Sequence, residues 1–347
     1  MEQNTEIVTN IEPEKPPSKF AKWNFYRHVK HPDFKIASKG KWYVIAPAVI
    51  VLIGIIMFAV LNFNLGLDFT GGQTVRIEGR YLTADTFAEH RDVVSTILRE
   101  EHGRNFRIWQ EETNGIVSMS VQFQTIGDDE NMAELTETIK SRITSHPDLT
   151  GVSVDDVGFI SASASAAHIQ TTFIAVFVAL MGILLYMLFR FKFTSGVAAL
   201  IGLMHDILVM MAMVIIFRIE INAAFIAALI TVVAYSINNT LILFDRVRGL
   251  EKNNEIRESI ESLTDRAVKE TFTRTMNTML TTLVPIFALI IASFPLNVPL
   301  LREFAVPIFF GLVAGTFSTI FLTTSLYVRF EKYRDAMRRR KKVATNT

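Results

Sequence analysis

The residues of this sequence that are best suited to carry chemistry are the polar side chains inside its long apolar runs. His205 and Asp206 stand in the middle of the apolar run 195–217, and Asp206 is the one carboxylate near the middle of such a run. A charged Asp at the centre of a bilayer costs roughly 2.5–3.5 kcal/mol on insertion scales, so such groups usually serve ion or proton pathways. A hydrogen bond that joins two helices is the alternative. We favour the functional interpretation.

A second group of polar residues lies in and just after the next apolar run. Its members are Tyr235, Ser236, Asn238, Asn239, Asp245 and Arg246. Adjacent residues on a helix point to different faces, so we expect His205 and Asp206 to diverge, and only one of Asn238 and Asn239 to face Asp206. Arg274 precedes the following run. Because the three runs are consecutive, we expect their helices to pack together and to point these groups at one another.

The composition argues against several classes of protein. The chain of 347 residues has no cysteine, so it has no disulfide framework and no cysteine-based metal or redox site. Its formal net charge is only +1, so we expect no nucleic acid partner. It has no P-loop, zinc-protease motif or nucleophile elbow. We therefore expect no cofactor, no metal and no catalytic residue, since a membrane-embedded enzyme would need more than one mid-membrane carboxylate or a nucleophile–base pair.

Half of the residues are hydrophobic, and they are concentrated in six long runs. A hydrocarbon core about 30 Å thick requires roughly 20 apolar residues for each helical crossing. The fold class is therefore a polytopic α-helical membrane protein with six transmembrane helices. We place them at residues 42–63, 169–189, 195–217, 221–244, 277–294 and 304–328. The first run is longer than the apolar core of a signal peptide, about 7–15 residues, so we expect an uncleaved span.

Lysine and arginine in the short loops predict the orientation. Basic residues follow the second and fourth spans, as in Arg190 and Arg248, and they flank both ends of the chain. The loops on the other side carry one arginine each, Arg218 and Arg302, and each is beside a glutamate. We therefore expect both termini in the cytoplasm and residues 64–167 on the outer side.

Three further segments are expected on the cytoplasmic side. Residues 1–41 form a tail whose second half is basic with interleaved aromatic residues, which favours binding to anionic membrane lipids over a solvated linker. Residues 329–347 form a basic tail. Within the region 168–328, which holds spans two to six, residues 245–273 are charged with sparse apolar positions. They predict an amphipathic helix along the membrane that continues into the fifth span.

The extracytoplasmic segment 64–167 has the pattern of an α+β domain. Four strands and two helices are expected, in the order strand 73–79, helix 84–102, strands 106–110 and 116–123, helix 128–145 and strand 152–159. An Asn-Gly pair at Asn114 predicts the hairpin between the second and third strands. The order β-α-β-β-α-β is the ferredoxin-like plan. A domain of this size can sustain its own core, so we expect it to fold alone.

Short motifs along almost the whole chain resemble those of the SecF subunits of the bacterial protein-export machinery, a branch of the RND transporter superfamily. The matching residues are Asp68, Phe69, Gly71 and Gly72 in a G-L-D-F-T-G-G stretch, His205-Asp206, Tyr235-Ser236, Asp245-Arg246, Arg274-Thr275, Gly311 and Gly315. The resemblance implies a subunit that pairs with SecD beside the SecYEG channel in the bacterial inner membrane. It also implies use of the proton-motive force, or of sodium in some bacteria, to help pull unfolded preproteins across, with YajC and SecA as further partners.

One departure from the family pattern concerns the relay. The family carries Asp where this chain has Asn239, and that Asp is interpreted as a proton-relay residue near the arginine that Arg274 matches. An amide cannot ionise near neutral pH, so a relay by protonation cannot run through Asn239. Asp206 is then the available mid-membrane carboxylate, with His205 and Asn238 as neighbouring candidates. Two outcomes stay open. Either coupling passes through acidic residues of the partner, or Asn239 locks the relay in a state that mimics a protonated carboxyl group.

Two alternatives also stay open. Gly311 and Gly315 form a small-xxx-small pair that suits packing against a homologous partner, and packing within the chain is an equal alternative. The alternative function is that of a half-unit of an RND-type small-molecule or lipid exporter. Such an exporter predicts a much larger outer domain and twice the number of spans.

Overall fold

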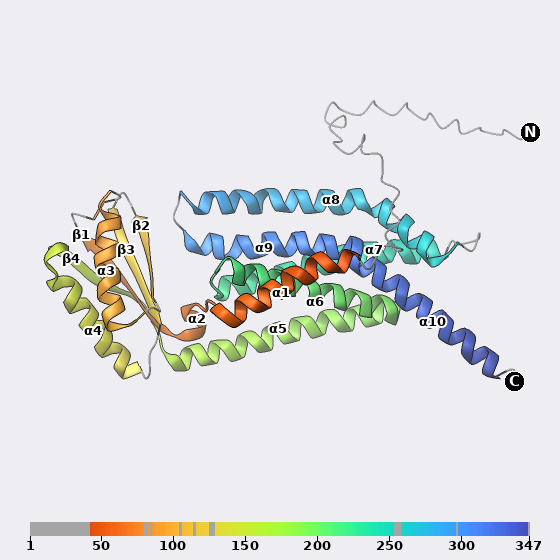
Figure 1. The fold of residues 1–347 in the computed structure, drawn as a ribbon, viewed down its shortest axis with the longest axis horizontal. Helices are drawn as coiled ribbons and strands as arrows, with labels where there is room; N and C mark the ends of the chain where they lie inside the picture. The colour runs from red at the N-terminus through yellow and green to blue at the C-terminus, as the bar shows by residue number, and fades with distance from the viewer. Residues whose placement is uncertain are drawn as a thin grey trace, which may run out of the picture. The chain divides into compact units, whose positions relative to one another are not determined.

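The computed structural model describes most of the chain after the N-terminal tail. The described residues are 42–79, 82–83, 85–103, 106–113, 116–124, 129–252, 258–295 and 298–345. The tail 1–41 and the hairpin tip at Asn114 lie outside them. An α/β unit stands at one end of a set of long helices (Figure 1).

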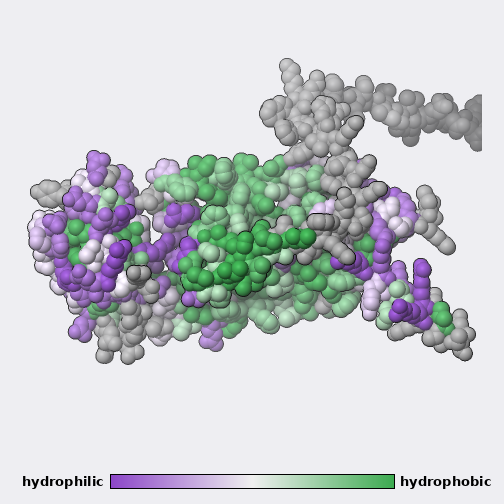
Figure 2. Space-filling model, in the orientation of Figure 1, coloured by the Kyte–Doolittle hydropathy of each residue, from purple (hydrophilic) through white to green (hydrophobic). Residues whose placement is uncertain are grey.

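Five of the described helical stretches are long and apolar enough to cross a membrane. They comprise α5 (Ala162–Arg190), α6 (Phe193–Ile216), α7 (Ala223–Lys252), α8 (Ile260–Ser293) and the continuous stretch of α9 (Pro299–Phe317), a π-helical segment (Ser318–Thr323) and α10 (Thr324–Thr345). The expected first span forms α1 (Trp42–Leu61), whose apolar part from Pro47 is shorter. Hydrophobic residues gather on the surface of the helices, and hydrophilic ones on the α/β unit and at the far end (Figure 2).

The helices differ in how much they bury within this chain. Helices α6, α7 and α9 pack against one another around an apolar core that includes Met210, Val232 and Ile308. In contrast, the most apolar stretch of α5 has no buried residue, and that of α8 has almost none. The outward faces of α5 and α8 are therefore free to contact lipid or another protein.

The two glycines of the last span pack inside the chain. A Cβ added to Gly311 would collide with the side chain of Val232 on α7, and a Cβ on Gly315 would lie 3.3 Å from that of Ser236. The absence of both Cβ atoms lets α9 approach α7 closely. Internal packing is thus the arrangement in the structure, and these glycines are not available to a partner.

The α/β unit contains a four-stranded antiparallel sheet in the order β2-β3-β1-β4. Its elements are β1 (Gly72–Gly79), α3 (Phe87–Glu101), β2 (Phe106–Thr113), β3 (Ile116–Gln124), α4 (Asp129–Ser145) and β4 (Val152–Ile160). Alternate residues of β1 and β3, such as Val75 and Val121, are fully buried against apolar residues of the two helices, such as Val94 and Ile139. This alternation with a period of two residues is what a half-buried strand requires.

One segment that was predicted to be cytoplasmic differs from expectation. The segment 245–273 is not one helix, because α7 continues to Lys252 and α8 starts anew at Ile260. The Ser259 side chain accepts a hydrogen bond from the backbone N–H of Ser262 at 3.3 Å, which is the geometry of a helix N-cap. The basic tail is helical to residue 345, since neither glycine nor proline interrupts the chain after Gly315.

Candidate functional site

Asp206 lies in a buried polar centre between three of the long helices. Its side chain is 0% exposed. The carboxylate accepts a hydrogen bond from the Ser236 hydroxyl on α7, and His205 Nδ1 lies 2.9 Å from its other oxygen. Ser318, in the π-helical segment, also contacts it. The Asp206 carboxyl group is therefore surrounded by hydroxyl groups and one imidazole rather than by a lysine or arginine side chain.

Glycine and the π-helical segment make room for this centre. A Cβ on Gly315 would lie 3.4 Å from Asp206 Oδ2. One turn before Asp206 on α6, Gly202 leaves space that the Thr323 hydroxyl occupies. The Thr324 hydroxyl donates to the carbonyl of Thr319, five residues earlier, at 3.0 Å. π-Helical segments inside α-helices are rare, and those that occur often lie at functional sites. This fits a helix that is deformed around a buried carboxylate.

Several buried polar atoms at this level lack a hydrogen-bond partner among the described residues. They are Asn239 Oδ1, Thr323 Oγ1 and His205 Nε2. Asn239 is 4% exposed and lies one turn after Ser236 on α7. A buried acceptor without a partner costs about 1–3 kcal/mol. A proton donor, a water molecule or a small cation entering this region would satisfy them.

The structure assembles only part of the expected set. His205 and Asp206 contact each other, so the expectation that they diverge is wrong; an imidazole ring can turn back toward the next side chain. Asn239 is buried on the same side of α7 as Ser236, whereas Asn238 is exposed and Tyr235 half-buried. Only one of the two asparagines thus faces the interior, as expected.

Arg274 does not join this centre. Its side chain is exposed on α8, and no ion pair to it exists among the described residues. The neighbouring Thr275 is buried, because consecutive residues on a helix point about 100° apart. The expectation that Arg274 meets Asp206 or Asn239 within this chain is therefore wrong: Arg274 lies on the open face of α8.

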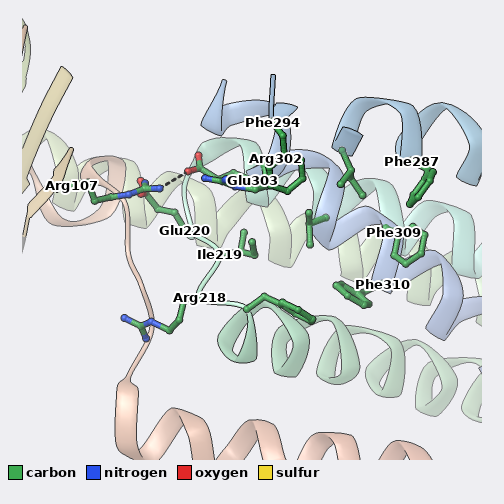
Figure 3. A pocket seen from close by; sticks show the side chains of 13 residues that line it. Arg107, Arg218, Ile219, Glu220, Phe287, Phe294, Arg302, Glu303, Phe309 and Phe310 are labelled. Carbon is green, nitrogen blue, oxygen red and sulfur yellow. Dashed lines mark hydrogen bonds and ion pairs between the residues drawn. The ribbon is translucent and has the colours of Figure 1, made fainter. Parts of the chain in front are cut away.

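A second polar centre joins the α/β unit to the ends of the helices (Figure 3). Arg107 of β2 forms ion pairs with Glu220, between α6 and α7, and with Glu303 of α9, the latter at 3.1 Å. Glu303 also accepts a hydrogen bond from Asn222 Nδ2 at 2.6 Å. Both glutamates are about 95% buried, with 5% exposed. The glutamates stand beside arginines in the sequence, but their partner Arg107 comes from the distant strand β2 and could not be predicted from these loops.

The glycine-rich motif before β1 lies beside this second centre. It forms a single turn, α2 (Leu67–Thr70), followed by Gly71 and Gly72 with φ of 70° and 141°. Such angles favour glycine. Asp68 Oδ2 accepts a hydrogen bond from the backbone N–H of Ala223 at 2.8 Å, at the start of α7. The Phe69 ring lies beside that of His168 in a tilted arrangement, with ring centroids 6.0 Å apart. The motif therefore fastens the junction between α1 and β1 to the helix that carries Ser236.

The remaining motif residues lie at the far end of the helices. Asp245 pairs with Arg190 at 3.3 Å, and Arg246 pairs with Glu270. These exposed pairs connect α7 to α5 and α8. In the described part of the chain, no three His, Cys, Asp or Glu residues are grouped as a metal site would require.

Comparison with known proteins matches this arrangement of helices and motifs to one family. The family model described as "Protein export membrane protein SecD/SecF, C-terminal" matches residues 142–333. The chain belongs to the SecD/SecF family. It is similar to the protein translocase subunit SecF of Petrotoga mobilis, with 27% identity over 304 residues, 87% of this chain and 98% of the relative.

Longer SecDF proteins also match. The protein translocase subunit SecDF of Bacillus subtilis is 25% identical over 93% of this chain, which covers 40% of the relative. A crystal structure of SecDF from Thermus thermophilus, described as a translocon-associated membrane protein, has a TM-score of 0.68 and 28% identity over 87% of this chain and 39% of that one. The chain therefore spans about two fifths of SecDF and nearly all of a SecF. It is a SecF-type, multi-pass membrane protein of the bacterial inner membrane, and the exporter alternative is not favoured.

Proposed function

We propose that this chain acts with SecD beside the SecYEG channel and promotes preprotein translocation assisted by an ion-motive force. Family membership makes it an accessory subunit of the Sec protein-export machinery. SecD is the expected partner, because the SecDF relatives extend well beyond the part that this chain matches. SecYEG, YajC, SecA and the unfolded preprotein are further proposed partners.

The buried Asp206 centre is the observation that carries the ion-coupled part of this proposal. A carboxylate with hydroxyl neighbours and unsatisfied acceptors nearby is suited to taking up and releasing a proton or small cation. Such an event would alter the contacts between α6, α7 and α9. Because Asp68 caps α7 and Glu303 belongs to α9, movement of these helices would reach the α/β unit.

Arg274 and Asn239 bear on whether the proton relay runs through this chain or through its partner. Arg274 is exposed on the open face of α8, and this face suits an acidic group of SecD. Either coupling passes through such partner residues, or Asn239 imitates a protonated carboxyl group. In both cases we propose that proton coupling through position 239 of this chain is weak or absent.

The finer architecture is also part of the proposal. We infer that α1 is a sixth span, that both termini are cytoplasmic, that the α/β unit is extracytoplasmic and that it has the ferredoxin-like plan. The domain limits at residues 41, 63, 167 and 328 remain predictions, as does lipid binding by the tail 1–41. The chain is proposed to work without catalysis.

A translocation assay tests this function. Membrane vesicles that lack their own SecF-type subunit would receive this chain together with its SecD, and import of an unfolded preprotein would be measured. We expect import to rise above that with SecD alone, and Asp206→Asn to remove most of the ion-dependent increase. Thr171→Ala is the matched control, because its hydroxyl only bonds to carbonyls of its own helix. Import that is indifferent to the chain would contradict the proposal.

A further inference from the structure

A cavity of about 450 Å³ opens where the helices meet the α/β unit. It lies between the end of α6, the end of α8 and the start of α9 (Figure 3). Its volume is in the range of about 300–1,000 Å³ that is typical of small-molecule sites. None of the expected functions uses it.

One part of the cavity is aromatic. Phe287 of α8 lies near Phe309 of α9, with ring centroids 6.4 Å apart, and Phe309 contacts Phe310 at 5.5 Å. Phe310 in turn stacks on Phe217, at the end of α6, at 5.2 Å. The four rings thus form a continuous wall that joins three helices. Phe217 and Phe287 are more than half exposed, so this wall is open toward the surroundings of the helices.

The opposite part of the cavity carries three arginines with different partners. Arg107 is held by two glutamates, and Arg218 donates to the backbone carbonyls of Leu61 and Asn62. Arg302 has no ion pair within the described part of the chain, and its guanidinium lies 6.0 Å from the centre of the Phe294 ring. Neither Arg218 nor Arg302 is paired with a carboxylate among the described residues, whereas the two glutamates share Arg107. Three arginines and two glutamates line the cavity, so its lining carries a net positive charge.

The charge and the aromatic wall are spaced like the two parts of an amphiphile. Arg302 precedes Phe309 and Phe310 on α9 by about two helical turns, or roughly 10–12 Å at 1.5 Å per residue. Arg302 is three residues after the start of α9 and so lies where helix gives way to loop, whereas the rings lie deeper along the apolar helix. This boundary is where lipid headgroups are found on membrane proteins.

We propose that this cavity binds one anionic phospholipid, with its phosphate on Arg302 and an acyl chain against the four phenyl rings. Arginine presents several N–H donors to phosphate, and the pairing is stronger at a membrane boundary than in water. An apolar helix of a partner protein would cover the rings but would leave Arg302 without an anion. A bound lipid would also bridge α6, α8 and α9 beside the Arg107–Glu303 ion pair.

Photolabelling of the full chain in lipid vesicles tests this proposal. Vesicles of phosphatidylcholine would contain a small fraction of phosphatidylglycerol or phosphatidylcholine that carries a photoreactive group on one acyl chain, and the labelled peptides would be mapped. We expect label on the segments that carry Phe287, Phe309 and Phe310, with the anionic lipid preferred. Arg302→Gln should lower this anionic labelling about tenfold, the equivalent of one charge-assisted hydrogen bond.

Two further variants keep the test decisive. Arg329→Gln removes an exposed positive charge at the other end of the helices and should not change labelling of the cavity. Val306→Trp should fill the cavity and exclude both lipids, even if Arg302→Gln unfolds the chain. Equal labelling by both lipids, or unchanged labelling with Val306→Trp, would overturn the proposal. Loss of all cavity label when SecD is present would likewise overturn it in favour of a protein occupant.

Discussion

The two polar centres of this chain stabilise buried carboxylates with different kinds of partners. Around Glu220 and Glu303, the neutralising group is an arginine from a distant element, and the result is a charged link between the α/β unit and the helices. Around Asp206, the neighbours are hydroxyls and one imidazole, and no fixed cation is provided by the described residues. An arginine partner supplies the opposite charge for a buried carboxylate, whereas hydroxyl groups can donate hydrogen bonds to it but bring no positive charge.

This difference assigns the two centres to different tasks. The Arg107 centre is suited to holding two parts of the molecule together, since breaking a buried ion pair is expensive. The Asp206 centre is suited to responding to an ion, since its partners are weak and several nearby acceptors are free. Substitutions at the first centre should therefore affect stability most, and those at the second should affect coupling most.

The largest expected effect on stability comes from Arg107→Met. It leaves two buried glutamates without a cation, which typically costs 3–5 kcal/mol; we expect about 3 kcal/mol because the Arg107 side chain is 34% exposed. The measurement is the free energy of unfolding from a titration of mixed micelles with a denaturing detergent. Arg91→Met is the matched control on the same unit, because the Arg91–Asp92 pair is exposed and should contribute less than about 1 kcal/mol. Equal effects of the two substitutions would show that the link is not important for stability.

Gly311→Leu should have the next largest effect. The new side chain would overlap Val232 and force α9 away from α7, and overpacking of this kind costs about 1–3 kcal/mol. The same titration measures it, and Gly182→Leu on α5 is the control because no atom would lie within 4 Å of an added Cβ there. Val232→Ala should partly rescue Gly311→Leu. If the double variant shows no rescue, the two residues do not limit the approach of the helices.

Ser236→Ala should have a small effect on stability. It removes one hydrogen bond to Asp206 while His205 remains, and interhelical hydrogen bonds in membranes contribute about 0.6 kcal/mol on average. Its effect on ion-dependent translocation should be larger than its effect on unfolding. A loss of stability as large as that of Arg107→Met would remove the distinction between the two centres.

Much of the fold could be predicted from hydrophobic periodicity. Five long apolar helices and the strands from residue 72 onward follow directly from runs of apolar residues and from alternation. The sequence did not predict the end of α7 and the new start of α8 after Ser259, because a charged helical pattern does not show whether it forms one helix or two. A single serine N-cap before Ile260 was the available indication.

The candidate site was harder to predict than the fold. Asp206 and Ser236 could be recognised because polar residues in apolar runs are few. The Arg107 link could not, since Arg107 is 113 positions before Glu220 and 196 before Glu303, and nothing local distinguishes it from other arginines of the α/β unit. Arg274 was misplaced because consecutive spans need not turn their polar faces toward one another within one chain. A face that is completed by another subunit has the same sequence pattern as one that is completed internally.

The role of position 239 is tested most directly by the dependence of preprotein translocation on an imposed proton gradient. This dependence is compared between the original chain and Asn239→Asp in vesicles that contain SecD and SecYEG. We expect a small gradient-dependent stimulation with Asn239, because an amide cannot carry a proton, and a larger one with Asn239→Asp. Asn238→Asp, at an exposed neighbouring position, is the matched control and should not add stimulation. Full stimulation with the original chain and no gain from Asn239→Asp would contradict the claim that position 239 limits coupling.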